Sequence, residues 1–309
     1  MSKEVLVKSL AGIKVLSKPV SNESSESYTL SSEQFQFYED NGYLVLKELI
    51  DFASLYSYKQ RFLQICKGLV PTSMAHIRVT KEPELAKQNL KPEQCINKLT
   101  DFLYDEVLST YGEHQALLSV VSQFIGDDIT AVNSMFINKP PGASRHPGHQ
   151  DLFYFPFRPA EKIIASWTAI DHVTHENGCL YVIPGSHKEK KLYEHGDKQN
   201  ALKHYHGLDE DILAPLDKQV HLEMSPGDTV FFNPYLVHGS GPNRSKNYRK
   251  AISFHFANSS CYYIDVKNTV QEHLAKELEE YSKTKGLPIN YTDFWRMKSK
   301  QMKGIRSNL

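Results

Sequence analysis

The stretch SRHPGHQDLFYFPFRP, residues 144–159, places His149 and Asp151 two positions apart, where a loop turns into an aromatic-rich run. In an extended segment, side chains at positions i and i+2 point to the same side, so this imidazole and this carboxylate can converge. Burying two such polar groups costs free energy unless a partner compensates for the lost water. The stretch therefore predicts a metal site on a β-rich framework.

The sequence that follows is typical of an all-β core. From residue 128 to about 265, short β-forming runs succeed one another: ITAVNSMFI, DLFYF, IIASWTAIDHV, CLYVI, VHLEM, DTVFFN and KAISFHFA. Turn residues separate them in KPPG, ENG, IPGSH, SPGD and GSGPN, and no helical pattern intervenes. This succession predicts a barrel or a sandwich and argues against alternating strands and helices.

Helices are expected on both sides of this core. Ser31 or Ser32 can cap a helix that Asn41-Gly42 ends. The other predicted elements are a strand at 43–47, helices at about 51–67, 113–126 and 270–285, and a loop at 79–94, which is charged and interrupted by prolines.

The chain is predicted to form a single domain after a flexible arm. Residues 1–29 are polar and serine-rich towards their end, which is typical of a mobile segment. Residues 30–309 then form the domain, with a helical part at about 30–126, a β-core at about 128–265 and C-terminal helices at about 268–300.

Composition excludes several classes of protein. Lys plus Arg and Asp plus Glu both number 36 in the 309 residues, so no uniformly basic surface for nucleic acid or anionic lipid is expected. The sequence contains no run of about eighteen apolar residues, so it predicts no membrane-spanning helix. The four cysteines form no CxxC pair, which argues against a structural zinc site and for a reducing compartment.

His238, in PGDTVFFNPYLVHGSGPNRS, is the best candidate for a third metal ligand. It stands where a strong β-forming run meets a glycine-rich turn. Two histidines and one carboxylate on one face of an octahedron are typical of non-haem Fe(II) oxygenases. Spacing alone leaves open that His149 and His238 are hydrogen-bonded core residues. It also leaves other histidines nearby, namely His146, His172 and His175.

Arg249 adds a second kind of site. It follows His238 across the turn GSGPNRSKNY, so a hairpin between the two β-forming runs would bring His238 and Arg249 together. A guanidinium can hold a carboxylate through two parallel hydrogen bonds. Iron beside such an arginine suits 2-oxoglutarate as cosubstrate. The alternative is an ordinary surface charge within the basic segment RSKNYRK.

These motifs together resemble the phytanoyl-CoA dioxygenase family over roughly residues 30–265. The matching blocks are SMFINKPPG, SRHPGHQDLFYFPFRP, SWTAIDHVTHENGCLYVIPGSHK, PGDTVFFNPYLVHGSGPNRS and RKAISFHFANSSCYYIDV. The resemblance implies a mainly β fold with flanking helices and a double-stranded β-helix core (jelly-roll, cupin-like). It also implies Fe(II) at His149, Asp151 and His238, and 2-oxoglutarate anchored by Arg249.

The resemblance further implies that Lys98, Met135 and Trp167 contact 2-oxoglutarate. Without the resemblance, the local sequence would make Met135 and Trp167 core residues and Lys98 a solvated charge on a helix edge. Trp167 shares a strand face with Ala165 and Ala169, which would leave room beside its ring. O2 is the expected second cosubstrate, and ascorbate the expected reductant.

The activity that the resemblance implies is 2-hydroxylation of a 3-methyl-branched fatty acyl-CoA, such as phytanoyl-CoA, in fatty-acid α-oxidation. Two alternatives remain open. One is the same oxygenase chemistry on a different small molecule, and the other is a non-catalytic jelly-roll protein that binds a metal.

The expected location is the peroxisome. Ser307-Asn308-Leu309 resembles the C-terminal peroxisomal address S-K-L, which an import receptor reads. The N-terminus lacks the cleavable presequence expected of the nearest relatives, which favours a C-terminal address. The alternative location is the cytoplasm. The loop between NKPPG and SRHP is also shorter than expected.

Overall fold

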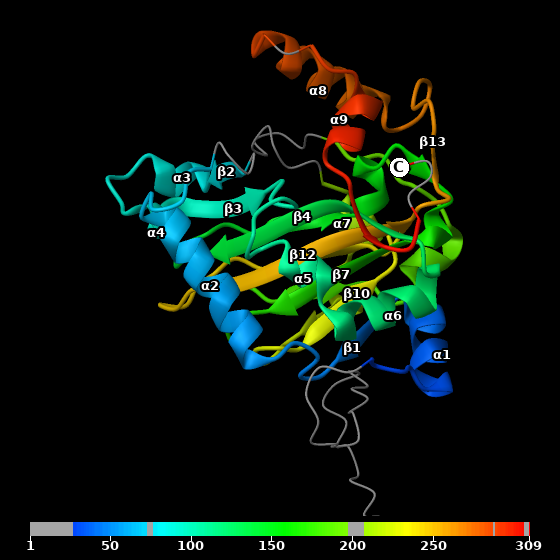
Figure 1. Ribbon diagram of the computed structural model, residues 1–309, viewed down its shortest axis with the longest axis horizontal. Coiled ribbons are helices and arrows are strands. Elements are labelled where there is room, and N and C mark those ends of the chain that lie inside the picture. Colours follow the sequence, from blue (N-terminus) through cyan, green and yellow to red (C-terminus); the bar gives the residue numbers. More distant parts are fainter. Residues whose placement is uncertain (1–26, 73–76, 197–206, 287, 306–308) are drawn as a thin grey trace, which may run out of the picture.

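Two antiparallel β-sheets form the centre of the molecule in the computed structural model, which describes residues 27–72, 77–196, 207–286, 288–305 and 309 (Figure 1). The larger sheet has eight strands, in the spatial order β1 (Tyr43–Leu46), β10 (Thr229–Phe232), β7 (Ile163–Ala169), β12 (Arg249–Asn258), β4 (Ile129–Lys139), β3 (Ile96–Thr100) and β2 (Arg78–Lys81), with β14 (Lys300–Lys303) paired to β4. The smaller sheet has the order β5 (His146–His149), β11 (His238–Ser240), β8 (Leu180–Val182) and β9 (Val220–Leu222).

Short elements connect these strands. A two-stranded pair joins β6 (Phe157–Arg158) to β13 (Tyr262–Tyr263). The described part of the chain also forms the 3-10 turns η1 (Asp151–Tyr154), η2 (Ala160–Lys162), η3 (Ser186–Glu189) and η4 (Leu216–Lys218).

Helices surround the two sheets, and local sequence explains where they begin and end. They are α1 (Ser32–Asn41), α2 (Phe52–Cys66), α3 (Pro83–Ala86), α4 (Pro92–Cys95), α5 (Thr110–Glu113), α6 (Gln115–Ile125), α7 (Glu210–Leu213), α8 (Glu272–Thr284) and α9 (Tyr291–Met297). Ser31 and Gln34 form a capping box at the start of α1, and Gly42 ends it in the left-handed conformation. None of the helices in the described ranges has the length and apolar character needed to cross a membrane.

The two faces of the larger sheet have different roles. On β12, Phe254 points outward into a buried cluster that includes Phe62 of α2 and Val121 of α6. These helices cover the near face of the sheet in Figure 1. The opposite face packs against the smaller sheet, because a second cluster joins Trp167 of β7 to Val182 of β8. Two facing antiparallel sheets of this kind form the double-stranded β-helix that the sequence predicts.

Register decides which residues of the larger sheet face the smaller one. Met135 of β4, Ser253 of β12 and Trp167 of β7 are direct cross-strand neighbours, so their side chains point to the same inner face. With the two-residue period of a strand, Arg249, Ala251 and His255 share that face of β12. The inner face therefore carries a row of polar groups along β12.

Most predicted elements are confirmed, with three differences. The region 79–94, expected mainly as a loop, contains most of β2 and the short helices α3 and α4. DLFYF, expected as a strand, forms η1 over its first four residues. Residues 1–26 of the predicted arm lie outside the described residues, whereas Tyr28 is buried and its N–H donates to Ser119 Oγ at 2.7 Å.

Candidate active site

The structure brings His149, Asp151 and His238 together between the two sheets. His149 and His238 are paired residues on β5 and β11, and Asp151 begins η1 just after β5. Asp151 Oδ1 lies 3.4 Å from His149 Nε2 and 3.7 Å from His238 Nε2. All three side chains are buried, and their ligating atoms lie within 4.8 Å of one another. Among the described residues, they form the single cluster with this property.

Backbone carbonyl groups set the tautomer of both histidines. His149 Nδ1 lies 2.9 Å from the Pro147 carbonyl oxygen, and His238 Nδ1 lies 3.0 Å from that of Leu236. A carbonyl only accepts, so each Nδ1 must carry the proton. In a neutral ring, each Nε2 then presents a lone pair towards Asp151 Oδ1. The donor set of two imidazoles and one carboxylate fits Fe(II).

Burial and neighbouring side chains hold His238 and Asp151 in the protonation states that metal binding requires. Burial, reinforced by the nearby His149, lowers the pKa of His238 to about 4, so this ring is neutral at pH 7. Burial by itself would raise the pKa of Asp151, but the neighbouring His255 and His238 outweigh it and hold this pKa well below its usual value. Asp151 is therefore a carboxylate at neutral pH.

Asp151 uses its two oxygen atoms differently. Oδ1 faces the two histidines, whereas Oδ2 lies 2.8 Å from Nε2 of His255 on β12. His255, on the larger sheet, thus holds Oδ2 of Asp151, a residue that follows β5 of the smaller sheet. Nothing in the local sequence around His255 signals this role, because its partner is 104 residues away.

Arg249 occupies the other end of the inner row on β12. It is 1% exposed, and its Nη2 donates to the Gly178 carbonyl oxygen at 2.9 Å. Its Nε and Nη1 have no hydrogen-bond partner, and neither does Trp167 Nε1 beside it. Burial lowers the pKa of Arg249 to about 10, which leaves the guanidinium charged at neutral pH. Buried donors without a partner are costly, so this arrangement fits a bound carboxylate.

The three other predicted cosubstrate residues lie on the same face of the sheet. Met135 and Trp167 flank Ser253, and Lys98 on β3 is the cross-strand neighbour of Ile137 on β4. Lys98 is therefore on a strand, so its alternative placement on a helix edge is wrong. Burial, followed by the nearby Arg78, lowers the pKa of Lys98 to about 8, although Asp151 opposes this shift.

Two geometric expectations about these residues are wrong. His238 and Arg249 form no hairpin: β11 pairs with β5 and β8, whereas β12 pairs with β4 and β7 in the other sheet. The alternative of a surface charge is also wrong, because Arg249 is buried. Asp151 is not part of the strand that ends at His149. It converges with His149 through the first turn of η1.

The region around Arg249 contains further buried charges that sequence reasoning missed. Lys139, directly opposite Arg249 on β4, donates to the Ser144 carbonyl oxygen and to Ser240 Oγ, both at 3.0 Å. Burial and the adjacent Arg249 hold the pKa of Lys139 well below its usual value. Ser240, which accepts from Lys139, stands two residues after His238 on the same strand. This two-residue spacing is the sequence signal that could have pointed to Ser240.

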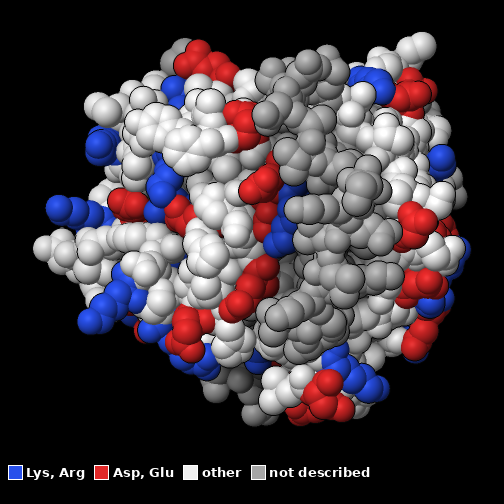
Figure 2. All heavy atoms as spheres, turned by 90° about the horizontal axis from the view of Figure 1, so that it is seen from below, with Lys and Arg blue, Asp and Glu red and all other residues white. Residues whose placement is uncertain are grey.

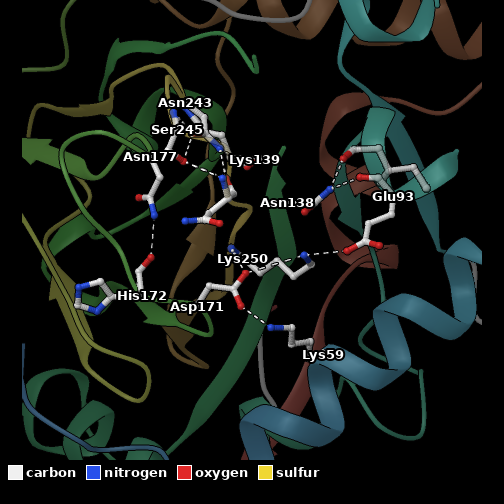
Figure 3. A network of polar contacts seen from close by, with 12 residues as sticks. Lys59, Glu93, Asn138, Lys139, Asp171, His172, Asn177, Asn243, Ser245 and Lys250 are labelled. Carbon is white, nitrogen blue, oxygen red and sulfur yellow. Dashed lines mark hydrogen bonds and ion pairs between the residues drawn. The ribbon is translucent and has the colours of Figure 1, made fainter. Parts of the chain in front are cut away.

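A polar network braces this end of the sheet (Figure 3). Asn243, in the loop after His238, donates to the Lys139 carbonyl oxygen at 2.9 Å and to that of Asn247 at 2.7 Å. Lys250 lies 3.0 Å from Glu93, and Asp171 lies 2.6 Å from Lys59. The backbone that carries Arg249 is thereby held from both sides.

The remaining candidate histidines lie outside the three-residue cluster. His146 is on β5 with its ring 4.5 Å from that of His149, measured between centroids. His172 and His175 are exposed in the turn between β7 and β8. The aromatic residues Phe153 and Phe155 are buried in the core.

The surface shown in Figure 2 carries both signs of charge. Outside the atoms that are not described, Lys and Arg side chains alternate with Asp and Glu. This view agrees with the equal numbers of acidic and basic residues in the sequence.

Comparison with known proteins gives a consistent result. The family model for phytanoyl-CoA dioxygenase (PhyH) matches residues 38–251. A probable phytanoyl-CoA dioxygenase of Caenorhabditis elegans is 42% identical over 316 residues, which cover 96% of this chain and 100% of the relative. The peroxisomal phytanoyl-CoA dioxygenase of Homo sapiens is 40% identical over 295 residues, which cover 92% of this chain and 86% of the relative.

A solved structure supports the fold. The epimerase SnoN, in complex with Fe3+, alpha ketoglutarate and nogalamycin RO, matches with a TM-score of 0.56 at 18% identity. The match covers 76% of this chain and 86% of that one. At this identity the likeness concerns the jelly-roll fold alone.

Proposed function

This chain is a dioxygenase that belongs to the phytanoyl-CoA dioxygenase family, and from that premise we propose that it hydroxylates carbon 2 of a 3-methyl-branched fatty acyl-CoA. The observation that carries the proposal is the convergence of His149, Asp151 and His238 opposite a buried Arg249 whose Nε and Nη1 have no hydrogen-bond partner. That combination suits a metal ion and a dicarboxylate bound side by side.

In this proposal, His149, Asp151 and His238 hold Fe(II), and Arg249 binds the distal carboxylate of 2-oxoglutarate. The iron supplies the oxidising chemistry when it is bound, with ascorbate as the reductant that restores Fe(II). The overall reaction balances: acyl-CoA, 2-oxoglutarate and O2 give 2-hydroxyacyl-CoA, succinate and CO2. One oxygen atom enters the new hydroxyl group and the other enters succinate.

The chain's own residues bind and orient the cosubstrate. Trp167 presents an unpartnered indole N–H and covers one face of the Arg249 guanidinium. Lys98 adds positive charge on the same face of the sheet, and Met135 supplies an apolar wall. Because Trp167 and Arg249 are almost completely buried, water is excluded from their contact with the ligand, which strengthens the electrostatic attraction.

The substrate is the part of the proposal that rests on relatives. Those from Caenorhabditis elegans and Homo sapiens are named for phytanoyl-CoA, and the alignments span nearly the whole chain. By this argument, the chain acts in fatty-acid α-oxidation.

The test is succinate formation by the Fe(II)-loaded protein, with and without phytanoyl-CoA. We expect succinate to rise with the acyl-CoA and to match the 2-hydroxylated product in amount. Succinate formation that does not respond to the acyl-CoA would support 2-oxoglutarate as the cosubstrate but contradict phytanoyl-CoA as the substrate. No succinate from protein with confirmed iron would favour a non-catalytic binding protein.

We also propose that the protein works in peroxisomes and that the import receptor binds its C-terminus. Relatives from Rattus norvegicus, Homo sapiens and Bos taurus are named peroxisomal. Ser307 and Asn308 lie outside the described residues, whereas Leu309 is 3% exposed within a buried cluster that includes Trp295. The receptor must therefore draw Leu309 out of that cluster.

Fluorescence microscopy tests this location. A fluorescent protein fused to the N-terminus should mark peroxisomes, and deletion of residues 307–309 should leave the fusion in the cytoplasm. Peroxisomal fluorescence after the deletion would show that the address lies elsewhere.

A further inference from the structure

A chain of polar contacts runs from the C-terminal segment to the metal-facing carboxylate. Asp101 Oδ1 lies 2.8 Å from Lys298 Nζ, which lies 3.4 Å from Asn133 Oδ1. Asn133 Nδ2 lies 3.4 Å from His255 Nδ1, and His255 Nε2 lies 2.8 Å from Asp151 Oδ2. We propose that these residues form a relay that fixes the orientation of Asp151 for metal binding, an inference that rests on the proposed function.

The register of the sheet places the members of the relay side by side. Asn133 of β4 and His255 of β12 are cross-strand neighbours on the inner face. Lys298 lies between α9 and β14, and β14 pairs with β4 from Lys300 onward. This pairing brings Lys298 beside Asn133. The C-terminal segment thereby contacts the residues around the proposed metal site, although it lies far along the sequence from the proposed ligands.

The lysine decides the direction of every hydrogen bond in the relay. An ammonium group only donates, so Lys298 requires the oxygen of the Asn133 amide to face it. The amide nitrogen then faces His255, and because an NH2 group only donates, His255 Nδ1 must accept. The proton of the neutral imidazole is consequently on Nε2, where it donates to Asp151 Oδ2. Without Lys298, the Asn133 amide loses the contact that fixes its orientation.

Neighbouring groups hold the relay in place. Trp295 lies beneath the Lys298 ammonium, 4.6 Å from ring centroid to Nζ, and Phe155 meets the His255 ring edge-on at 5.0 Å. Burial lowers the pKa of Lys298, and its contact with Asp101 opposes this shift. With Oδ2 occupied by His255, Asp151 presents Oδ1 to the two ligand histidines.

His255 is thus a positioning residue that acts through Asp151. Groups that orient a metal ligand typically contribute 10- to 100-fold to metal affinity. A His255→Leu variant should therefore bind Co(II) roughly 10- to 100-fold more weakly. His255→Gln places an amide N–H near the former Nε2 position and should recover much of that affinity. Equal losses in both variants would assign His255 a purely structural role and overturn the relay.

The remote member provides the sharper test. Lys298→Met should weaken Co(II) binding although this residue has no contact with the ligands. Lys300→Met is the matched control, because Lys300 lies in the same segment and its amine pairs with Glu113 at 2.8 Å on the surface. Unchanged Co(II) affinity in Lys298→Met would overturn the relay.

Two measurements keep the result independent of turnover. Titration of the apo-protein with Co(II), followed by its visible absorption bands, gives the affinity of each variant. Nitrogen-15 NMR of labelled histidine should show the proton of His255 on Nε2 in the wild type, and a proton on Nδ1 would overturn the relay. If the wild type binds no Co(II), the proposed function fails; if it binds Co(II) but the variants do not differ, only the relay fails.

Discussion

The guanidinium of Arg249 lies over the indole ring of Trp167, with its central carbon 5.3 Å from the ring centroid. The Gly178 carbonyl oxygen accepts a hydrogen bond from one end of the same guanidinium, at 2.9 Å. Two contacts therefore fix the plane of the group and leave Nε and Nη1 without partners. These N–H groups remain available to donate to the oxygen atoms of a bound carboxylate.

Replacing Arg249 with lysine should raise the KM for 2-oxoglutarate. Lysine keeps the charge but loses the second hydrogen bond, which is worth about 1.5–3 kcal/mol, or roughly tenfold to a hundredfold in affinity. Succinate formation at varied 2-oxoglutarate concentration measures the change. Arg244→Lys, an exposed arginine of the same segment, is the control. An unchanged KM in Arg249→Lys would show that the anchor lies elsewhere.

Removing a metal ligand should abolish turnover without unfolding the protein. Asp151→Ala and His238→Ala each take away one of three ligands, so we expect both iron content and succinate formation to fall to background. Far-UV circular dichroism should remain that of the wild type. His172→Ala, which removes an exposed histidine, should change none of these quantities. Near-normal activity of either ligand variant would contradict the assignment.

Binding of 2-oxoglutarate should weaken as the pH rises above about 8, the pKa to which burial lowers Lys98. A lysine is charged below its pKa, so the attraction to the dicarboxylate is present at pH 7 and is lost through this range. Arg249, with a pKa of about 10, stays charged at pH 8. The measurement is the KM for 2-oxoglutarate between pH 7 and 9. In the Lys98→Arg variant, the KM for 2-oxoglutarate should change little between pH 7 and 9. If the KM rose equally in this variant and in the wild type, Lys98 would not be the group responsible.

A methyl group at Gly178 should disturb both stability and cosubstrate binding. Gly178 has a φ of +86°, and an added Cβ would lie 2.5 Å from the Gly241 carbonyl oxygen. Gly178→Ala should lower the free energy of unfolding by more than the roughly 1–2 kcal/mol expected from the left-handed backbone alone. It should also raise the KM for 2-oxoglutarate, because the Gly178 carbonyl holds Arg249.

The matched control for this prediction is Gly68→Ala. Gly68 has a φ of +71° but open space around the added methyl group. Gly68→Ala carries the cost of the left-handed backbone without steric crowding. The KM of this variant for 2-oxoglutarate should stay at the wild-type value. Equal unfolding curves for the two variants in denaturant would contradict the prediction.

Local patterns predicted the strands and the pairing of His149 with Asp151, because both depend on short-range spacing. Alternating β-forming runs gave β7, β10 and β12, and the HxD spacing gave His149 and Asp151. Which sheet each strand joins is decided by packing between distant segments. The expected hairpin between the runs of His238 and Arg249 is wrong for this reason, since the chain crosses from the smaller sheet to the larger one between them.

Contacts made across long sequence separations were also beyond local patterns. His255 meets Asp151 across 104 residues, and Lys298 meets Asn133 across 165. Lys139 contacts Ser240 across 101 residues. Each of these side chains reads locally as an ordinary strand or surface residue. Their roles follow from register in three dimensions, which local sequence patterns do not reveal.

The division of the site between two sheets has a consequence for the lifetime of the protein. Two of the proposed metal ligands, His149 and His238, lie on β5 and β11, whereas Arg249 lies on β12, so a bound metal and 2-oxoglutarate together would tie the two walls of the sandwich to each other. A ligand that binds only the folded state stabilises it by RT ln(1 + L/Kd), where L is the ligand concentration, an amount that falls as the ligand concentration falls. We expect the half-life of the protein in cells, measured by pulse-chase, to shorten when 2-oxoglutarate is scarce. The amount of enzyme would then follow the supply of its own cosubstrate.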